Sequence, residues 1–224
     1  MPIPDLILER AAIFVPLVLS LTVHEWAHAW TAWRLGDDTA KMLGRVSLNP
    51  LDHIDPIGTV LLPLLGVPFG WAKPVPVNPV RFRTGISMPI GMLITAVAGP
   101  IANLLLAAGS TAAVAGLVLF ANHDMLSSFG PHSTDTLYQL FYYMVLVNIL
   151  LACFNLLPIP PLDGSRIADA LMPRALRPLW SQFTAIGPLV LVALLVGPIL
   201  LGVNAFAWPL HWINELIVWL QPVG

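Results

Sequence analysis

Apolar residues run along this chain in long blocks that are separated by short polar stretches rich in proline, glycine and arginine. The longest blocks cover residues 6–34, 86–122, 136–157 and 179–202. Each is long enough for a helix that spans a bilayer, which needs about 20 apolar residues, so we predict about four transmembrane helices. Residues 204–221 are also apolar but rich in tryptophan, which favours an interfacial helix over a fifth span.

The region between the first two blocks breaks this pattern. Residues 44–50 predict a short extended strand. Residues 56–72 are apolar but are interrupted by prolines and glycines, which favours a β-hairpin-like or re-entrant region over a clean span. Further prolines in residues 71–83 forbid a helix and predict an extended, edge-type segment. The predicted fold class is therefore an all-α polytopic membrane protein with one short irregular region.

Composition supports this class. Hydrophobic residues make up 57% of the chain and charged residues only 10%, with a mean hydropathy of +0.81, whereas soluble domains have about 25% charged residues. We expect one membrane-embedded domain over residues 1–224, with a catalytic core at about 6–177 and C-terminal helices at about 178–221. A net charge of −2 offers no basic surface to nucleic acid. The single cysteine, Cys153, excludes an intrachain disulfide and a cysteine-based zinc site.

Basic residues are unevenly distributed among the polar loops. Loops 34–45, 73–83 and 166–177 contain lysine or arginine, whereas loop 122–135 contains neither. The positive-inside rule therefore places the three basic loops in the cytoplasm and the N-terminus outside. We expect a multi-pass protein of a prokaryotic cell membrane. Its first block is too long, and lacks the basic start, for a cleaved signal peptide.

The first apolar block contains a cluster of ionisable residues at membrane depth. His24, Glu25 and His28 are the only ionisable residues between positions 11 and 33. On a helix His24 and His28 lie one turn apart on one face, so both imidazoles can reach one zinc ion, with Glu25 beside its open position. Unpaired ionisable groups are costly in a bilayer, which favours a functional site over a chance pattern or a polar packing contact.

A catalytic zinc site requires a third protein ligand, and Asp163 is the preferred candidate. It follows an apolar span at the point where Pro158, Pro160 and Pro161 break the helix. Irregular backbone at that depth must line a protein cavity. Three alternatives follow the first helix closely: Asp52, His53 and Asp55. Asp124 and Asp135 are weaker candidates, because they lie in the loop expected on the opposite side of the membrane.

Such a ligand set predicts hydrolysis. Zinc lowers the pKa of a bound water to about 7 and polarises a peptide carbonyl, while Glu25 accepts the proton of the water and returns it to the leaving amine. The oxyanion needs a further donor, and Asn155 and Asn103 are candidates because both are amides inside apolar segments. Both also have structural interpretations. Asn155 can satisfy carbonyls freed at the proline break, and Asn103 can link helices.

Four motifs stand out along the chain: His-Glu-Trp-Ala-His at 24–28, Gly-Arg-Val-Ser-Leu-Asn-Pro at 44–50 with His-Ile-Asp-Pro-Ile-Gly at 53–58, Gly-Pro-Ile-Ala-Asn at 99–103, and Asn-Leu-Leu-Pro-Ile-Pro-Pro-Leu-Asp-Gly at 155–164. Together they resemble the site-2 protease family of intramembrane zinc metalloproteases. The last motif, at the expected distance from the first, makes the resemblance specific.

The resemblance implies one zinc ion per chain, held by His24, His28 and Asp163, with Glu25 as catalytic base and Asn155 near the oxyanion. It also implies a substrate that is itself a transmembrane helix, cut within or beside the lipid bilayer in regulated intramembrane proteolysis. The active site should lie nearer the cytoplasmic face. We expect the compact form without a PDZ or CBS domain, in which the membrane core or an adaptor partner selects the substrate.

Two other functional classes remain open. A metal transporter would have histidine and acidic residues on several spans and inverted repeats, and neither pattern is evident in the sequence. A catalytically inactive membrane scaffold would keep the fold without the chemistry, and the intact Glu25 argues against it.

Overall fold

A computed structural model describes residues 3–61, 70–121 and 131–201 of the protein. The helices in these ranges are α1 (Ile3–Arg34), α2 (Thr39–Met42), α4 (Met88–Ala121), α5 (Pro131–Asn155), α6 (Asp163–Leu171) and α7 (Arg177–Leu200). Short 3-10 or π turns are η1 (Pro50–Asp52), η2 (Pro56–Leu61), η3 (Pro79–Arg81) and η5 (Arg174–Leu176). No strand is assigned within the described ranges, so the fold is helical, as predicted.

Among the described residues, three helical segments are long and apolar enough to cross a membrane. They are Met88–Leu119, Thr136–Asn155 and Arg174–Gly197, and they match the second, third and fourth predicted spans. The first predicted span forms α1, a continuous helix whose apolar run is interrupted by the ionisable residues at positions 24, 25 and 28. That α1 crosses the membrane therefore stays a prediction. The apolar tail at 204–221 lies outside the described residues.

The strand predicted for residues 44–50 is wrong. Gly44 has a φ of +71°, a left-handed conformation that ends the preceding turn. The Asn49 side chain accepts a hydrogen bond from the backbone N–H of Leu51 and so begins η1 at Pro50. Local side-chain to backbone bonding thus outweighs the extended pattern. Of the hairpin-like region predicted for 56–72, the first part is the π turn η2, and residues 62–69 lie outside the described ranges.

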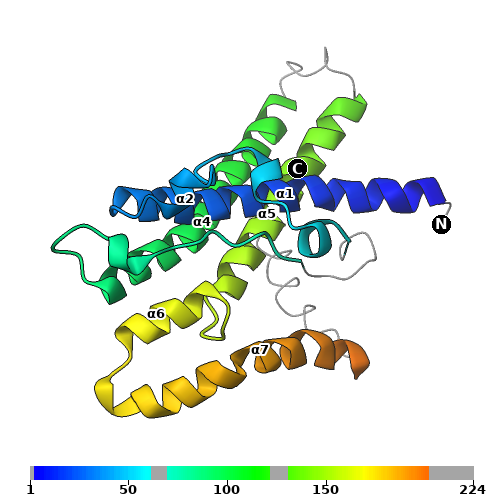
Figure 1. Ribbon diagram of the computed structural model, residues 1–224. Helices are drawn as coiled ribbons and strands as arrows, with labels where there is room; N and C mark the ends of the chain where they lie inside the picture. The colour runs from blue at the N-terminus through cyan, green and yellow to red at the C-terminus, as the bar shows by residue number, and fades with distance from the viewer. Residues whose placement is uncertain (1–2, 62–69, 122–130, 202–224) are drawn as a thin grey trace.

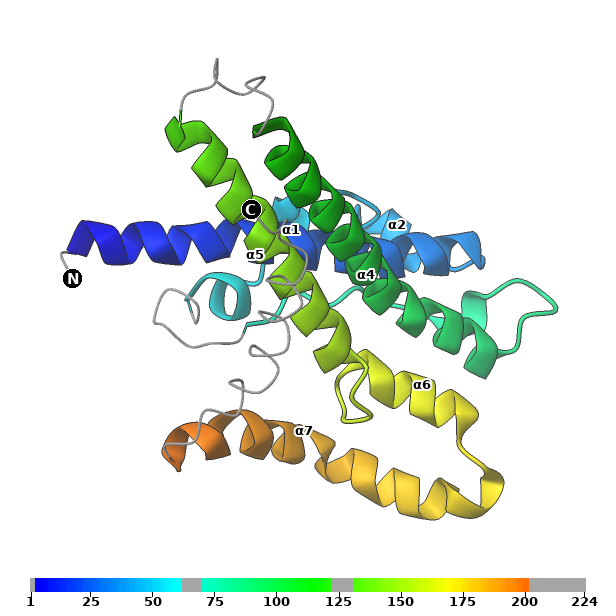
Figure 2. The same cartoon turned by 180° about the vertical axis from the view of Figure 1, so that it is seen from behind.

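Helices α1, α4 and α5 contact one another and form the centre of the fold. Helices α4 and α5 lie side by side, and α1 crosses both of them (Figures 1 and 2). Fully buried alanines on α1, such as Ala29 and Ala32, allow neighbouring segments to approach closely. Helix α6 leaves the end of α5, packs on α4, and leads the chain to α7. The crossing brings the middle of α1 against α4 and the start of α6.

Residues 70–78 form an extended segment in which the backbone groups of Trp71, Lys73 and Val75 form hydrogen bonds with backbone or side-chain groups of the rest of the protein. The pairs are Trp71 with Gly58 and Thr59, Lys73 with His53 and Arg45, and Val75 with Glu25. This alternation is that of an extended chain, as predicted for the first part of 71–83; residues Pro79–Arg81 instead form η3. Pro74 and Pro76 occupy the intervening positions, where no inward-facing N–H is lost.

Candidate metal centre

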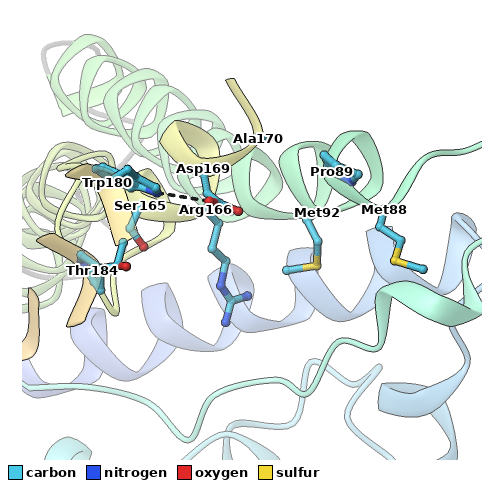
Figure 3. A pocket seen from close by; sticks show the side chains of 10 residues that line it. Met88, Pro89, Met92, Ser165, Arg166, Asp169, Ala170, Trp180 and Thr184 are labelled. Carbon is cyan, nitrogen blue, oxygen red and sulfur yellow. Dashed lines mark hydrogen bonds between the residues drawn. The ribbon is translucent and has the colours of Figure 1, made fainter. Parts of the chain in front are cut away.

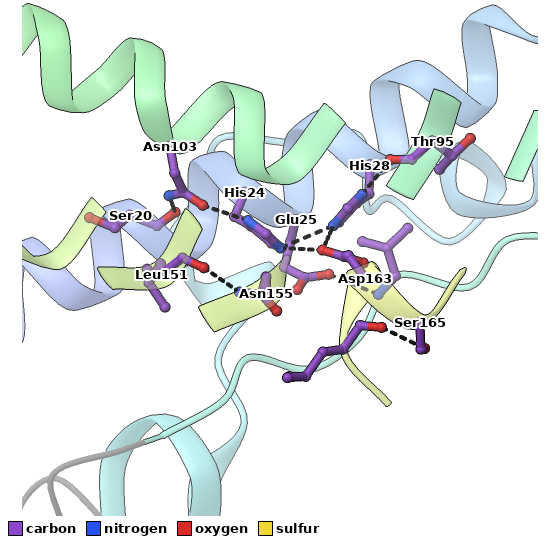
Figure 4. Close-up of polar contacts among 12 residues, drawn as sticks. Ser20, His24, Glu25, His28, Thr95, Asn103, Leu151, Asn155, Asp163 and Ser165 are labelled. Carbon is purple, nitrogen blue, oxygen red and sulfur yellow. Dashed lines mark hydrogen bonds and ion pairs between the residues drawn. The ribbon is translucent and has the colours of Figure 1, made fainter. Parts of the chain in front are cut away.

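Two histidines of α1 and the first residue of α6 bring three metal-binding atoms together (Figure 4). The Nε2 atoms of His24 and His28 are 3.0 Å apart, and Oδ2 of Asp163 lies 3.1 Å from each. All three residues are buried, with exposed fractions of 4, 6 and 8%. Three atoms that offer lone pairs at such distances repel one another unless a cation or a proton lies between them. The geometry therefore indicates a cation site.

The cluster fits zinc. Tetrahedral zinc with ligand distances of about 2.0–2.2 Å separates its ligand atoms by about 3.3–3.6 Å, so this triangle would open by only a few tenths of an ångström. Two imidazoles and one carboxylate are also a common ligand set of catalytic zinc, which keeps a fourth position for water. Within the described residues, no second group of three histidine, cysteine or acidic side chains is gathered in this way.

Hydrogen bonds at the far side of each imidazole set its tautomer. His24 Nδ1 lies 2.6 Å from Oδ1 of Asn103. His28 Nδ1 lies 2.7 Å from the carbonyl oxygen of Thr95. Both partners only accept hydrogen bonds, so each Nδ1 carries the proton and each Nε2 presents a lone pair to the cluster. Both Nε2 atoms are thus oriented so that they could bind a metal ion.

Asn103 belongs to a buried amide network that joins three helices. Its Nδ2 donates to Oδ1 of Asn148 at 2.7 Å and to the Ser20 carbonyl at 3.3 Å, which fixes the orientation of its amide. Asn148 Nδ2 in turn donates to Ser20 Oγ and to the Met144 carbonyl. The interhelical interpretation of Asn103 is therefore confirmed. Asn148 was missed, although it carries the same signal, an amide inside an apolar span.

Replacement of Asn103 by alanine should weaken zinc binding by about 10–100-fold, the usual cost of losing a partner of a ligating histidine. The His24 imidazole would lose its acceptor and its fixed orientation. Competition with a chelator of known affinity measures the effect. Ser110→Ala is the matched control, because this α4 hydroxyl bonds only to the Leu106 carbonyl of its own helix among the described contacts. Equal zinc affinities for the two variants would contradict the assignment.

Gly99 lets α4 pass directly over the histidine pair. A Cβ atom at this position would lie 2.4 Å from Nε2 of His28 and 2.6 Å from Cε1 of His24. We therefore expect Gly99→Ala to displace the imidazoles and to lower bound zinc severalfold. Gly109→Ala on the same helix meets nothing within 4 Å and should keep its zinc. Metal analysis of both purified variants checks this, and full zinc content in Gly99→Ala would show that the close approach is unnecessary.

Glu25 lies beside the cluster but is not one of its three members (Figure 4). Its Oε2 accepts a hydrogen bond of 3.0 Å from the backbone N–H of Val75. The carboxylate is therefore held by the extended segment, and it sits next to His24 in the sequence without joining the triangle. Its role as the proton acceptor stays a prediction.

The chain around Asp163 depends on a close contact between α6 and the end of α5. A Cβ atom at Gly164 would lie 2.2 Å from the carbonyl oxygen of Leu156, so only glycine fits there. Asn155, the last residue of α5, lies near the cluster and donates Nδ2 to the Leu151 carbonyl at 3.0 Å (Figure 4). Its role toward an oxyanion stays a prediction.

The sequence leaves five alternatives to Asp163 as third ligand: Asp52, His53, Asp55, Asp124 and Asp135. The first three do not join the cluster. Nε2 of His53 bonds to the Ser47 carbonyl, and Oδ1 of Asp55 accepts backbone N–H groups of the following turn. Asp135 lies near the start of α5, at the end remote from α6, and Asp124 lies outside the described residues. Of the acidic residues in the described ranges, Asp163 is the one that meets the histidines.

An open pocket of about 450 Å³ lies next to this centre, between the starts of α4 and α7 and the side of α6 (Figure 3). Its charged residues are Arg166 and Asp169, and Asp169 accepts a hydrogen bond from Nε1 of Trp180 at 3.2 Å. The rest of its lining is mostly apolar: Met88, Pro89, Met92, Pro160, Ala170, Ser165 and Thr184. None of the three clustered ligands lines this pocket, so it is distinct from the candidate metal centre.

A helical fold with membrane-type helices, a buried centre of two histidines and one carboxylate, and a glutamate beside it are the features expected of a metal-dependent hydrolase of the membrane. Comparison with known proteins agrees, because residues 12–198 match the model of the family described as Peptidase family M50. The chain belongs to this family, the site-2 protease family of zinc metalloproteases.

Relatives among the known proteins carry corresponding names. The chain is 39% identical over 202 residues to "Putative zinc metalloprotease YwhC" of Bacillus subtilis, covering 88% of this chain and 84% of the relative. It is 30% identical over 217 residues to "Putative zinc metalloprotease Rip2" of Mycolicibacterium smegmatis, covering 95% and 75%. The Rip2 protein of Mycobacterium tuberculosis is 30% identical over 222 residues, with the same coverage. No solved structure matches the chain significantly.

Proposed function

We propose that this protein is an intramembrane zinc endopeptidase that hydrolyses a peptide bond within or near a transmembrane segment of a membrane-protein substrate. The observation that carries the proposal is the buried triangle of His24, His28 and Asp163, with Glu25 beside it, among helices apolar enough to cross a bilayer. Membership of a zinc metalloprotease family supports the hydrolytic part of the proposal. Release of a domain by regulated proteolysis is its expected consequence.

Each polar residue of the centre has a proposed role. His24, His28 and Asp163 would hold one zinc ion per chain, which when bound would acidify a water molecule and polarise the scissile carbonyl. Glu25 accepts a proton from the attacking water and delivers it to the leaving amine. Asn103 and the Thr95 carbonyl hold the two imidazoles in the ligating tautomer. Asn155 donates an amide hydrogen to the developing oxyanion, using the hydrogen that does not bond to its own helix.

The proposed location is a prokaryotic cell membrane, with the centre nearer the cytoplasmic face. Cation–π pairs of Arg34 with Trp30 and of Lys41 with Trp33 lie at and just beyond the end of α1, as is typical of a headgroup interface. His28 lies six residues before Arg34, which is at most about 9 Å along a helix. The centre is then shallow enough for water to enter from the cytoplasm, as hydrolysis requires.

The proposed partners are a transmembrane-helix substrate, the lipid bilayer and an adaptor of unknown identity, with no role for nucleic acid. Purified protein in liposomes, mixed with a panel of single-span substrates, tests the proposal. We expect cuts within or beside the span, loss of cutting with a chelator and its recovery with zinc. A matched substrate whose span is replaced by a soluble linker should stay intact. Cleavage of the soluble version alone would contradict an intramembrane substrate.

The transporter alternative predicts a different result from the same liposomes. Zinc flux across the bilayer that survives Glu25→Gln, together with no cleavage of any substrate, would favour transport. A scaffold would bind substrates without flux or cleavage. The endopeptidase proposal expects cleavage without flux.

A further inference from the structure

Arg45 is a buried cation whose side chain contacts a backbone carbonyl. It is 6% exposed, and its Nη2 donates to the carbonyl oxygen of Lys73, whereas its Nε meets no hydrogen-bond partner among the described residues. Within the described part of the chain, no carboxylate forms an ion pair with it. Burying a guanidinium without an anion is costly, so the Lys73 contact needs a reason beyond stability.

The same residue, Lys73, is also held at its other backbone group. Its N–H donates to the carbonyl oxygen of His53 at 2.9 Å. His53 is itself buried, 2% exposed, and its Nε2 is fixed by the Ser47 carbonyl. Arg45 and His53 thus clamp both backbone groups of one residue of the extended segment.

This clamp sets the register of the segment against Glu25. Two residues beyond Lys73, the N–H of Val75 donates to Oε2 of the glutamate. The neighbours of Val75 are Pro74 and Pro76, which have no N–H. A slip of one residue in either direction would therefore leave Glu25 without its donor.

We propose that Arg45 is a positioning residue for the general base, acting through the Lys73–Val75 backbone. By holding Lys73, Arg45 keeps the N–H of Val75 against Oε2 of Glu25. This hydrogen bond directs the other carboxylate oxygen of Glu25 toward the reacting water. The inference rests on the proposed function, because it assigns Glu25 the role of base. Misplacing a catalytic group by about 1 Å costs up to 10²-fold in rate, so the clamp has a measurable effect.

Hydrogen exchange of the Val75 amide tests the clamp without relying on proteolysis. In Arg45→Gln we expect the Val75 amide to exchange at least about tenfold faster than in wild type, because the segment loosens. Arg81→Gln is the matched control: this arginine pairs with Asp38 at the surface, and it should leave the exchange unchanged. Unchanged exchange in Arg45→Gln would overturn the proposal whether or not the protein cleaves any substrate.

Kinetics on a single-span substrate then test the link to Glu25. We expect Arg45→Gln to lower kcat roughly 10–100-fold, with KM within about twofold and bound zinc unchanged, and Arg45→Lys to recover part of the loss. Val75→Pro removes the same N–H directly and should cost at least as much, whereas Val75→Ala keeps the N–H and should cost much less. The double variant with Arg45→Gln and Val75→Pro should be no slower than Val75→Pro alone.

Other results would count against the clamp. Additive losses in the double variant would place the action of Arg45 elsewhere, and a rise in kcat would make the Val75 contact an inhibitory latch. Zinc loss in Arg45→Gln would reduce its role to general stability. A different outcome separates the two proposals. If the Val75 amide exchanges faster in Arg45→Gln but the wild-type protein cuts no substrate, the clamp is supported and the endopeptidase function is contradicted.

Discussion

Glu25→Gln should lower cleavage of a single-span substrate by about 10²–10⁴-fold, while zinc per chain stays at the wild-type level. Glutamine keeps the size of the side chain and an oxygen that can accept the Val75 N–H, but it cannot take a proton from water. Cleavage rate and metal content of the same purified sample measure the two expectations together. The matched control is Asp38→Asn, which makes the same chemical change at a half-exposed carboxylate away from the cluster.

Wild-type rates in Glu25→Gln would remove this residue from the mechanism and show that another group accepts the proton of the water. Loss of zinc in Glu25→Gln would mean that the carboxylate is a ligand after all. A loss of rate in Asp38→Asn equal to that in Glu25→Gln would point to a general charge effect.

Asp163→Ala should abolish both zinc binding and cleavage. The variant leaves two imidazoles, which is one protein ligand fewer than catalytic zinc sites use. It also removes the only carboxylate of the three-residue cluster. We expect zinc content well below one ion per chain and no detectable cleavage without added zinc. Asp169→Ala, on the same helix but bonded to Trp180, is the control that should keep its metal.

Added zinc separates two explanations of such a result. Recovery of part of the activity at high zinc concentration would show that Asp163 contributes affinity, as a ligand does. Full zinc content in Asp163→Ala would show that another residue completes the site, and Asp52 or Asp55 would then be the first to examine.

Much of this fold could be predicted because membrane-type helices leave a strong compositional signal. The spans that became α4, α5 and α7 are long runs of apolar residues, and their limits follow from prolines and basic residues. His24 and His28 could be paired from their spacing alone, since a helix places them on one face. Asp163 could be proposed because the proline break implied a cavity beside the membrane helices.

The part of the site that could not be predicted from the sequence consists mostly of contacts made by backbone groups. The Thr95 carbonyl that orients His28 and the Val75 N–H that holds Glu25 belong to residues with no polar signature of that role. The close passage over Gly99 likewise depends on how α1 crosses α4, which no local pattern encodes. The failed strand at 44–50 has a different cause, because short-range turn bonds around Asn49 decided that segment.

The distance between the ligands along the chain also determines when the centre can exist. Asp163 lies 139 residues after His24, so ribosomes that add about 5–20 residues per second need roughly 7–28 s to make the intervening chain. During that time α1 has its two histidines but neither the third ligand nor, at first, the Asn103 acceptor. On the proposed function, a nascent chain therefore cannot attack neighbouring membrane proteins, and metal loading becomes a checkpoint of biogenesis that only a chain made beyond Asp163 can pass.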